Sequence, residues 1–213
     1  MILTGLLGGS FNPAHQGHRH ISLAAMAALG LDDMGWMGSP GNPLKSREGM
    51  APLATRFASA LRAAEGTSIK VTAIEEELGT RYTLETLQAL IARFPDRRFL
   101  WLMGADNLSQ FHLWKQWQDI AHTVPIAVAG RPGYDEDAHK APAMGWLRRF
   151  VLPADQVRNR TMGSLPTLVL LQLPPDPTSA TAIRAADPDW HESKDYSFNP
   201  KSLRDQVTQR LVT

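Results

Sequence analysis

The stretch ILTGLLGGSFNPAHQGH, residues 2–18, joins an apolar run to a pair of glycines, a proline and two histidines. Its first part, residues 2–7, has the length and the apolar character of a buried β-strand. Residues 16–29 follow with the spacing of a helix, and Gly30 is placed to cap its C-terminus. A strand, a glycine-rich turn and a helix in this order indicate the first unit of an α/β fold.

Strand-length apolar runs and segments of helical period alternate along the rest of the chain. The run at residues 99–103 is apolar throughout, as expected of a central strand that is covered on both faces. This alternation predicts a Rossmann-like, doubly wound parallel sheet with helices on both faces. Such sheets bind ligands at the carboxyl ends of their strands, which is where the opening stretch lies. We expect the other strands over residues 34–37, 69–74, 125–129 and 168–173, and the other helices over residues 52–64, over residues 83–94 and from Asn199 onward.

Two of these expected helices carry an apolar stripe at helical spacing, which predicts the face that each buries. Thr83 is placed to cap the second of them. The stripes consist of Leu53, Phe57 and Leu61 in the first helix, and of Leu84, Leu87, Leu90 and Ile91 in the second.

Length and composition are those of an ordinary globular protein. The chain has 213 residues, 43% hydrophobic and 20% charged, and at roughly 150 residues per domain this length favours one domain with a small appendage. A formal net charge of +1 provides no field that would draw the whole molecule to nucleic acid or to an anionic membrane. No apolar run approaches the ~20 residues that span a bilayer, and no targeting segment is recognisable. We therefore expect no nucleic-acid partner and no membrane partner.

The chain contains no cysteine. This excludes a disulfide framework, a thiolate metal site and a cysteine nucleophile. It also fits the reducing conditions of the cytoplasm, where we expect the protein to act.

The turn after the first strand has features that suit a phosphate group. Glycines let a backbone pass close to a ligand, and the start of the following helix offers N–H groups and the positive end of a dipole. However, Gly5, Gly8 and Gly9 do not fit the dinucleotide fingerprint G-x-G-x-x-G, and no lysine follows them as in a P-loop. Positive charge must therefore come from other residues.

His15 and His18 are three residues apart, so they share one face of the first helical turn. Two imidazoles placed there could donate hydrogen bonds to phosphate oxygens, and Gly17 between them leaves room for a close approach. The alternative to a phosphate site is that the two histidines are paired for structural reasons and bind no ligand. A zinc site would need a third ligand, and neither H-E-x-x-H nor a cysteine is present, so we expect no metal held by the protein.

The whole string resembles the signature of the nucleotidylyltransferase superfamily, G-x-[ST]-F-D-P-x-H-x-G-H. Here the signature reads GGSFNPAHQGH over residues 8–18, with Asn12 in place of the usual Asp. Asn12 keeps the acceptor that forms the turn and loses the charge. The phosphate-binding backbone is therefore expected to be intact, and only a local role of the carboxylate is in doubt.

Later segments resemble the bacterial nicotinate-nucleotide adenylyltransferases of that superfamily. The C-terminal I-S-S-T-x-I-R of this family appears as TSATAIR over residues 178–184. The resemblance implies a nucleotidylyltransferase domain over residues 1–190. Residues 191–213 match no family segment, and we expect them to form a C-terminal helical tail packed on the same domain. The other matching segments, in family order, are RYTLETL at residues 81–87, FLWLMGADN at residues 99–107, residues 111–117 and RPG at residues 131–133.

This resemblance implies an enzyme of NAD biosynthesis that joins nicotinate mononucleotide to the AMP part of ATP. The products are nicotinate adenine dinucleotide and pyrophosphate, and Mg²⁺ accompanies ATP as the cofactor. The phosphate of the mononucleotide attacks the α-phosphorus directly, so that the protein needs no nucleophile. Such catalysis rests on positioning and on neutralising the charge of the leaving pyrophosphate.

The resemblance also implies which residues form the site. His15, His18 and Arg184 are the catalytic residues. The residues that bind ATP are Gly8, Gly9, Ser10, Phe11, His15, His18, Gly104, Asp106, Ser179, Thr181, Ile183 and Arg184. The residues that bind the pyridine nucleotide are Lys45, which reaches a phosphate, Tyr82 and Thr83, which face the carboxylate, and Trp114, which stacks on the ring.

Each of the less specific assignments has a structural alternative. Lys45 and Arg184 could be solvated surface residues, Trp114 could belong to the core, and Asp106 could cap the next helix. Other acceptors are also open, namely nicotinamide mononucleotide, phosphopantetheine and a cytidylyl acceptor, the last two being disfavoured by the segments around Tyr82 and Gly104. A regulator that binds nucleotide without catalysis is less favoured, and the sequence does not determine the oligomeric state.

Overall fold

The computed structural model describes residues 1–41, 49–130, 140–174, 176–193 and 196–213. The chain forms two compact units. The first unit contains residues 1–7, 21–34 and 82–175, and the second unit contains residues 8–20, 35–81 and 176–213.

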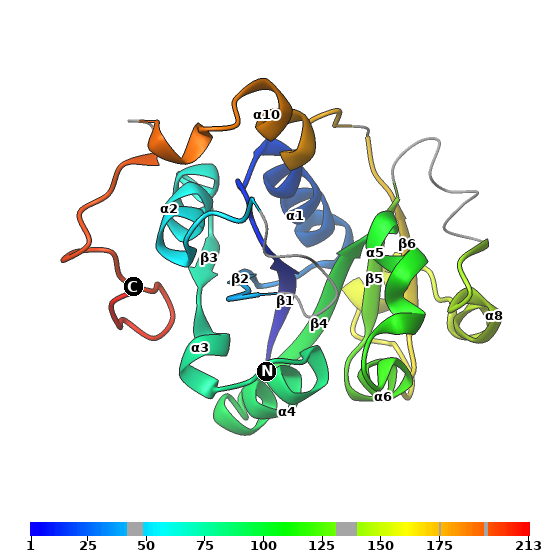
Figure 1. The fold of residues 1–213 in the computed structure, drawn as a ribbon. Coiled ribbons are helices and arrows are strands. Elements are labelled where there is room, and N and C mark those ends of the chain that lie inside the picture. The colour runs from blue at the N-terminus through cyan, green and yellow to red at the C-terminus, as the bar shows by residue number, and fades with distance from the viewer. Residues whose placement is uncertain (42–48, 131–139, 175, 194–195) are drawn as a thin grey trace. The chain divides into compact units, whose positions relative to one another are not determined.

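The described strands form one six-stranded sheet in the order β3-β2-β1-β4-β5-β6 (Figure 1). The chain runs outward from β1 to β3 and then returns to place β4 beside β1, so the direction of winding reverses there. The pairs β1–β4, β4–β5 and β5–β6 are parallel. This topology confirms the predicted doubly wound, Rossmann-like sheet. The strands are β1 (Ile2–Gly9), β2 (Asp33–Gly38), β3 (Ile69–Thr72), β4 (Arg97–Gly104), β5 (Ile126–Gly130) and β6 (Leu168–Gln172).

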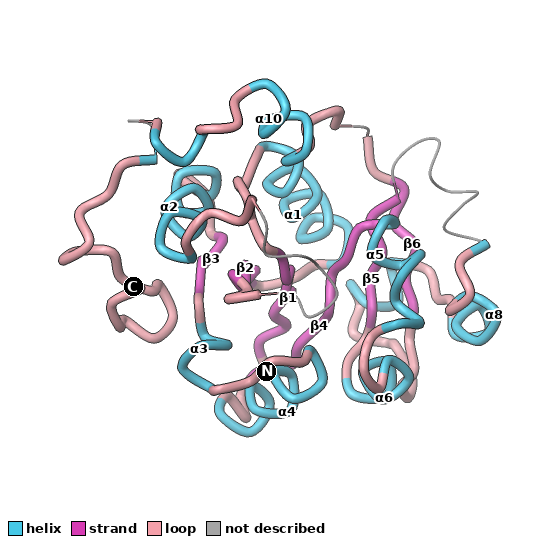
Figure 2. Tube along the Cα trace, in the orientation of Figure 1, coloured by secondary structure: helices cyan, strands magenta, loops and turns pink. Residues whose placement is uncertain are grey.

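Helices connect the strands, as Figure 2 shows in cyan. The α-helices are α1 (Gln16–Leu29), α2 (Leu53–Ala64), α3 (Ile74–Leu78), α4 (Thr83–Arg93), α5 (Ala105–Gln110), α6 (Trp117–Thr123), α8 (Met144–Leu147), α9 (Ala154–Arg158) and α10 (Ala180–Ala186). Single 3₁₀ turns are η1 (Phe111–Leu113), η2 (Arg148–Phe150) and η3 (Trp190–Glu192).

The central strand β4 explains why its sequence is apolar without alternation. Residues 99–103 are all buried, and Leu100 and Leu102 have no exposed surface. A strand with parallel neighbours on each side and helices on both faces has no side that meets water. Trp101 pairs in register with Leu6 of β1 and with Ile126 of β5.

The predicted boundaries of α1 are confirmed. The helix runs over Gln16–Leu29, and Gly30 follows it with a φ of +61°, the left-handed conformation in which glycine commonly ends helices. The prediction for residues 69–74 is only partly right. β3 ends at Thr72, because Ala73 and Ile74 begin α3.

The buried face of α2 differs from the predicted one. Phe57 is buried as expected, but Leu53 and Leu61 are half-buried. Arg56 and Ser59 occupy the buried face instead. The apolar stripe was misleading here because two polar residues point inward, toward acceptors and donors that periodicity does not reveal.

The prediction for α4 needs two corrections. Thr83 is the first residue of the helix rather than its cap, since Tyr82 holds the N-cap position and makes no capping hydrogen bond with its side chain. Leu84, Leu87 and Leu90 form the buried stripe, whereas Ile91 is 39% exposed.

The helix expected from Asn199 onward is absent. Residues 196–213 form turns, and Arg204 and Leu211 make an isolated antiparallel bridge. Asp205 accounts for this, because its carboxylate accepts hydrogen bonds from the main-chain N–H groups of Val207 (2.7 Å) and Thr208 (2.8 Å). A side chain that bonds to the backbone in this way competes with helix formation.

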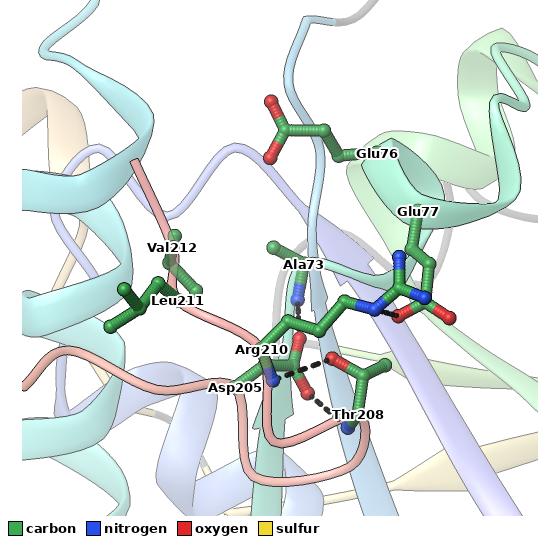
Figure 3. Close-up of a pocket in the computed structure, with 8 residues that line it drawn as sticks. All are labelled: Ala73, Glu76, Glu77, Asp205, Thr208, Arg210, Leu211 and Val212. Atoms are coloured by element: carbon green, nitrogen blue, oxygen red, sulfur yellow. Dashed lines mark hydrogen bonds and ion pairs between the residues drawn. The ribbon is translucent and has the colours of Figure 1, made fainter.

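The tail attaches to β3 within the second unit. Gln206 donates its N–H to the carbonyl of Val71 (3.1 Å) and accepts the N–H of Val71 at its side-chain oxygen (2.8 Å). Asp205 binds Ala73, and Arg210 pairs with Glu77 at 3.5 Å beside a small pocket (Figure 3). Among the described helices, none has the length and apolar character of a membrane span.

Candidate functional site

Two sets of predicted site residues are described, one in each compact unit. The histidine group, in the second unit, consists of residues 8–18 and 179–184. The tryptophan group, in the first unit, consists of residues 82–83, 104–106 and 111–115.

The two histidines of the first group are in direct contact. The ring centroids of His15 and His18 lie 3.9 Å apart with an angle of 44° between the ring planes. His15 is buried, with 8% of its surface exposed, and His18 is half-buried. The predicted proximity of the two imidazoles is therefore confirmed, although His15 lies immediately before α1 and only His18 lies in its first turn.

Main-chain hydrogen bonds fix both rings. His18 accepts the N–H of His15 at Nδ1 (3.2 Å), and His15 accepts the N–H of Gly17 at Nδ1 (3.1 Å). A neutral imidazole has one donor nitrogen and one acceptor nitrogen. Because Nδ1 is the acceptor in each ring, the proton of each neutral ring is on Nε2. In this tautomer each neutral ring carries one N–H donor, at Nε2.

Gly17 is required by the packing of this turn. A Cβ atom at Gly17 would lie 2.9 Å from Cε1 and Nδ1 of His15 and 3.1 Å from the carbonyl oxygen of Thr178. The close approach of a ligand, which the sequence suggested for Gly17, stays a prediction, whereas the structure shows that room is needed within the protein itself. The neighbours that need this room are the ring of His15 and the segment that precedes α10.

Asp176, two residues before Thr178, adds a carboxylate next to this turn. Hydrogen bonds from Thr178, first from its side chain and then from its N–H (2.8 Å), hold the pKa of Asp176 below its ordinary value. Slight burial acts in the opposite direction by a smaller amount, and electrostatic interactions with His20 and His15 lower the pKa of Asp176 slightly further. Asp176 is therefore ionised at neutral pH.

The loop between β1 and α1 has an unusual backbone. Phe11 has a φ of +47°, a left-handed conformation that costs a residue with a side chain about 1–2 kcal/mol. Its ring is 2% exposed and stacks on Trp36 at 5.2 Å, and it meets the edge of His18 at 5.0 Å. Burial of this aromatic ring offsets the cost of the backbone conformation.

The C-terminal motif reaches the same loop. Arg184 of α10 donates a hydrogen bond to the carbonyl of Asn12 (2.5 Å) and lies 3.4 Å from the hydroxyl of Thr181. Ser179 caps α10 by accepting the N–H of Ala182 (3.1 Å). The half-buried Ile183 lies between these polar residues on α10. The structure thus brings Arg184 to the loop that follows Gly8 and Gly9 of β1, although Arg184 and Asn12 are 172 residues apart along the chain.

Trp114, in the tryptophan group, follows the 3₁₀ turn η1. It is half-buried and makes edge contacts with Trp101 (6.2 Å) and Phe111 (5.4 Å). Those two residues are buried, with 3% and 0% of their surface exposed. Trp114 is therefore supported by the core from one side without belonging fully to the core.

Tyr82 and Thr83 begin α4, and the segment after Trp114 reaches them. Lys115 places its ammonium 4.1 Å from the centre of the Tyr82 ring, close enough for a cation–π interaction, and forms an ion pair with Glu85 at 3.0 Å. The structure thus brings together Tyr82 and the residue next to Trp114. Both Tyr82 and Thr83 are half-buried.

Gly104 and Asp106 lie at the end of β4. Gly104 is the N-cap residue of α5, so the alternative in which Asp106 provides the cap is wrong. Asp106 is exposed in the first turn of α5, and its carboxylate lies against the position that a Cβ of residue 104 would take. Glycine at 104 therefore lets the Asp106 side chain fold back toward the strand end.

Two predicted elements of the site are not placed. Lys45 and the RPG segment at residues 131–133 lie outside the described residues. Among the described residues, no cluster of three or more histidines and carboxylates could hold a metal ion.

Three residues shape the loop of the histidine group, and sequence reasoning named Asn12 but missed Arg56 and Ser59. Asn12 donates its side-chain N–H to the carbonyl of Gly49 (3.0 Å) and accepts the N–H of Ala51 (3.2 Å). Arg56 and Ser59 of α2 also bind this loop. One sequence signal could have indicated Arg56 and Ser59. They are three residues apart in α2, on a face that also carries small alanines suited to close packing.

Comparison with known proteins identifies the family of this chain. The family described as Cytidylyltransferase-like matches residues 6–186. A protein of Erythrobacter litoralis named "Probable nicotinate-nucleotide adenylyltransferase" is 58% identical over 211 residues, which cover 99% of this chain and 94% of the relative. A protein of the same name from Parvibaculum lavamentivorans is 51% identical over 183 residues, 86% of this chain and 91% of the relative.

The fold is also found among solved structures. The Plasmodium falciparum nicotinic acid mononucleotide adenylyltransferase complexed with NaAD matches with a TM-score of 0.62 at 14% identity, over 87% of this chain and 83% of that one. At this identity the match shows the fold alone. Together, the matched family and the near full-length relatives show that the chain belongs to the Cytidylyltransferase-like family and, within it, to the nicotinate-nucleotide adenylyltransferases.

Proposed function

We propose that this protein transfers the adenylyl group of ATP to nicotinate mononucleotide, giving nicotinate adenine dinucleotide and pyrophosphate in NAD biosynthesis. The geometry that supports this is the pair of imidazoles at the start of α1, with the guanidinium of Arg184 on the same loop. The nature of the acceptor is supported by the 58% identity to a relative of that name.

The histidine group binds the triphosphate of ATP in this proposal. The Nε2–H groups of His15 and His18 donate to phosphate oxygens. The main-chain N–H groups at the start of α1 provide further, uncharged donors to the phosphate. Arg184 contributes the fixed positive charge. Gly8, Gly9, Ser10 and Phe11 shape the backbone, while Ser179, Thr181 and Ile183 place Arg184.

Within the tryptophan group, Trp114, Tyr82 and Thr83 bind the pyridine nucleotide. Trp114 offers a ring for stacking, supported from behind by Trp101 and Phe111. Tyr82 and Thr83, at the start of α4, face the carboxylate of the substrate. Asp106 and Gly104 bind a ribose of the adenylyl half.

The chemical step needs no covalent intermediate on the protein. An oxygen of the mononucleotide phosphate forms a bond to the α-phosphorus of ATP, and the bond from that phosphorus to the bridging oxygen of pyrophosphate breaks. The charge that leaves with pyrophosphate is stabilised by His18 and Arg184, which are held before the reaction begins.

The cofactor proposed for this reaction is Mg²⁺, carried by ATP. The described histidine group offers imidazole, guanidinium and hydroxyl groups, whereas Mg²⁺ prefers oxygen ligands with near-octahedral geometry. These residues suit the phosphate oxygens rather than the metal. Mg²⁺ would therefore be held chiefly by the phosphate oxygens of ATP, where it supplies charge neutralisation.

Pyrophosphate release from ATP, measured with each acceptor separately, tests the proposal. We expect the highest kcat/KM with nicotinate mononucleotide, a lower value with nicotinamide mononucleotide, and no release with phosphopantetheine. Faster release with another acceptor would reassign the substrate. ATP binding without release with any acceptor would favour a non-catalytic regulator. Action in the cytoplasm remains a prediction from composition.

A further inference from the structure

We propose that Arg56 and Ser59 of α2 are positioning residues that hold the phosphate loop, residues 10–15, in the shape that binds ATP. The inference rests on the proposed function, because it takes this loop as the ATP site. Neither side chain belongs to the signature that identifies the family, and both lie on the buried face of α2.

Arg56 ties the loop to two other segments of the second unit. It is 2% exposed, and its guanidinium donates to the carbonyls of Ser10 (2.5 Å), Ser39 (2.9 Å) and Ala51 (2.9 Å). Ser10 begins the loop, and Ser39 follows β2. A planar guanidinium can donate in three directions at once, whereas the single ammonium of a lysine cannot keep the same geometry.

Ser59 holds the other end of the same loop. It is 1% exposed, accepts the N–H of Ala14 at its hydroxyl (3.1 Å) and donates to the carbonyl of Arg56 (2.7 Å). Residues three apart in a helix lie on one face. One face of α2 therefore binds the loop at Ser10 and at Ala14, on either side of Phe11 and Asn12.

The loop needs such support because its own conformation is unfavourable. Phe11 adopts a left-handed backbone with a φ of +47°, and conformations of this kind persist only where the surrounding structure imposes them. His15 follows Ala14 directly, so the two hydrogen bonds of α2 fix the backbone that leads into the paired imidazoles. Displacement of that backbone would misplace His15 and the loop carbonyl of Asn12 that Arg184 binds.

Burial of a guanidinium solely to fill the core would be unfavourable. Burial lowers the pKa of Arg56, since the charged form loses water. The hydrogen bonds to three main-chain carbonyls compensate for this loss. A purely structural role is the competing explanation, and it predicts reduced stability without a selective effect on ATP.

The test compares Arg56→Lys and Ser59→Ala with a matched control, Arg97→Lys. Arg97 also joins separate segments, donating to Thr4 (2.8 Å) and pairing with Asp33 (2.5 Å), but it does so at the amino ends of β1 and β2 in the first unit. Calorimetry with Mg·ATP alone measures the ATP Kd. Steady-state assays give kcat and the KM of each substrate, and thermal melts give Tm with and without ATP.

We expect Arg56→Lys to raise the ATP Kd and lower kcat/KM for ATP by about tenfold to a hundredfold, as misplacement of a binding group by about 1 Å does. The KM for nicotinate mononucleotide should change less than threefold. Ser59→Ala should act in the same direction with a smaller effect, and it carries the test if Arg56→Lys does not fold. Arg97→Lys should lower Tm and leave the ATP Kd unchanged.

An unchanged ATP Kd in the folded Arg56 and Ser59 variants would overturn the inference, as would an equal change in the KM of both substrates. Failure of the proposed function would look different, since the wild-type protein would then release no pyrophosphate. The binding measurement needs no acceptor, so it tests the role of α2 in either case.

Discussion

His18 is the residue on which the chemistry of the proposed site depends most. Its Nδ1 accepts the N–H of His15, so Nε2 provides the donor for a phosphate oxygen. We expect His18→Ala to lower kcat by roughly 10²-fold or more, the usual effect of losing one preorganised donor. The KM for ATP should change much less, because Arg184 and the backbone of the loop still bind the ground state.

His18→Asn is the matched variant. An asparagine oxygen can take the place of Nδ1 and keep the N–H of His15 bonded, but no group takes the place of Nε2. We therefore expect kcat of His18→Asn to be as low as that of His18→Ala. A kcat near the wild-type value would mean that His18 serves only to hold His15. Activity that is lost when zinc is removed with Mg²⁺ in excess would instead favour a metal site.

Trp114 should affect only the pyridine nucleotide. Trp114→Ala removes one stacking surface, worth on the order of 1 kcal/mol or more, so KM for nicotinate mononucleotide should rise several-fold or more. KM for ATP should stay within about twofold if the ring has no other function. Steady-state kinetics with each substrate varied in turn measures both values. An equal rise in the two KM values, with a large fall in Tm, would place Trp114 in the core.

At the scale of elements, α10 is expected to act through Arg184 rather than through packing. None of the residues of α10 is buried, so Arg184→Ala should lower Tm little. It should lower kcat/KM for ATP strongly, because a guanidinium beside Asn12 is lost. Thermal melts and ATP kinetics on the same preparation decide this. A large fall in Tm with unchanged kcat/KM would make Arg184 a structural residue.

In contrast to α10, the C-terminal tail is expected to affect stability and not activity. Asp205 is 3% exposed and accepts four hydrogen bonds, two of them from Thr72 and Ala73 at the end of β3. Asp205→Ala leaves these donors unsatisfied and should lower the free energy of unfolding by about 2–4 kcal/mol. Chemical denaturation measures this, with kinetics at low temperature expected to be unchanged. A normal free energy of unfolding would show that the tail is not anchored by Asp205.

The strands and long helices could be predicted because their signals are local. The buried run of β4 and the glycine after α1 each follow from a short stretch of sequence. The tail could not be predicted from local sequence, because Asn199 and Pro200 resemble a helix start. Two of the partners of Asp205, Thr72 and Ala73, lie about 130 residues away at the end of β3. Short helices such as α5 and α6 also give too little periodicity to be recognised.

In the candidate site, too, residues with a local sequence signal were predicted and residues that depend on distant partners were not. The family motifs identified His15, His18 and Arg184 from the sequence. The fold then shows their contacts, His15 with His18 and Arg184 with the carbonyl of Asn12. Arg56 and Ser59 were missed because periodicity assigned the inner face of α2 to Leu53 and Leu61. Inward polar residues are recognised only when their partners, here main-chain groups of another segment, are known.

For the whole molecule, the central claim is adenylyl transfer to nicotinate mononucleotide. It follows from a doubly wound sheet, a histidine group suited to phosphate and a relative that is 58% identical along 99% of the chain. The claim concerns one reaction with two products, so both products must be measured in one experiment.

The most direct test is to incubate the wild-type protein with Mg·ATP and nicotinate mononucleotide and to quantify the products by chromatography and mass spectrometry. The account predicts nicotinate adenine dinucleotide and pyrophosphate in equal amounts, with ATP consumed one for one. Both products should fall together in His18→Ala. Release of inorganic phosphate or AMP without the dinucleotide, or consumption of ATP that does not depend on the mononucleotide, would contradict the account.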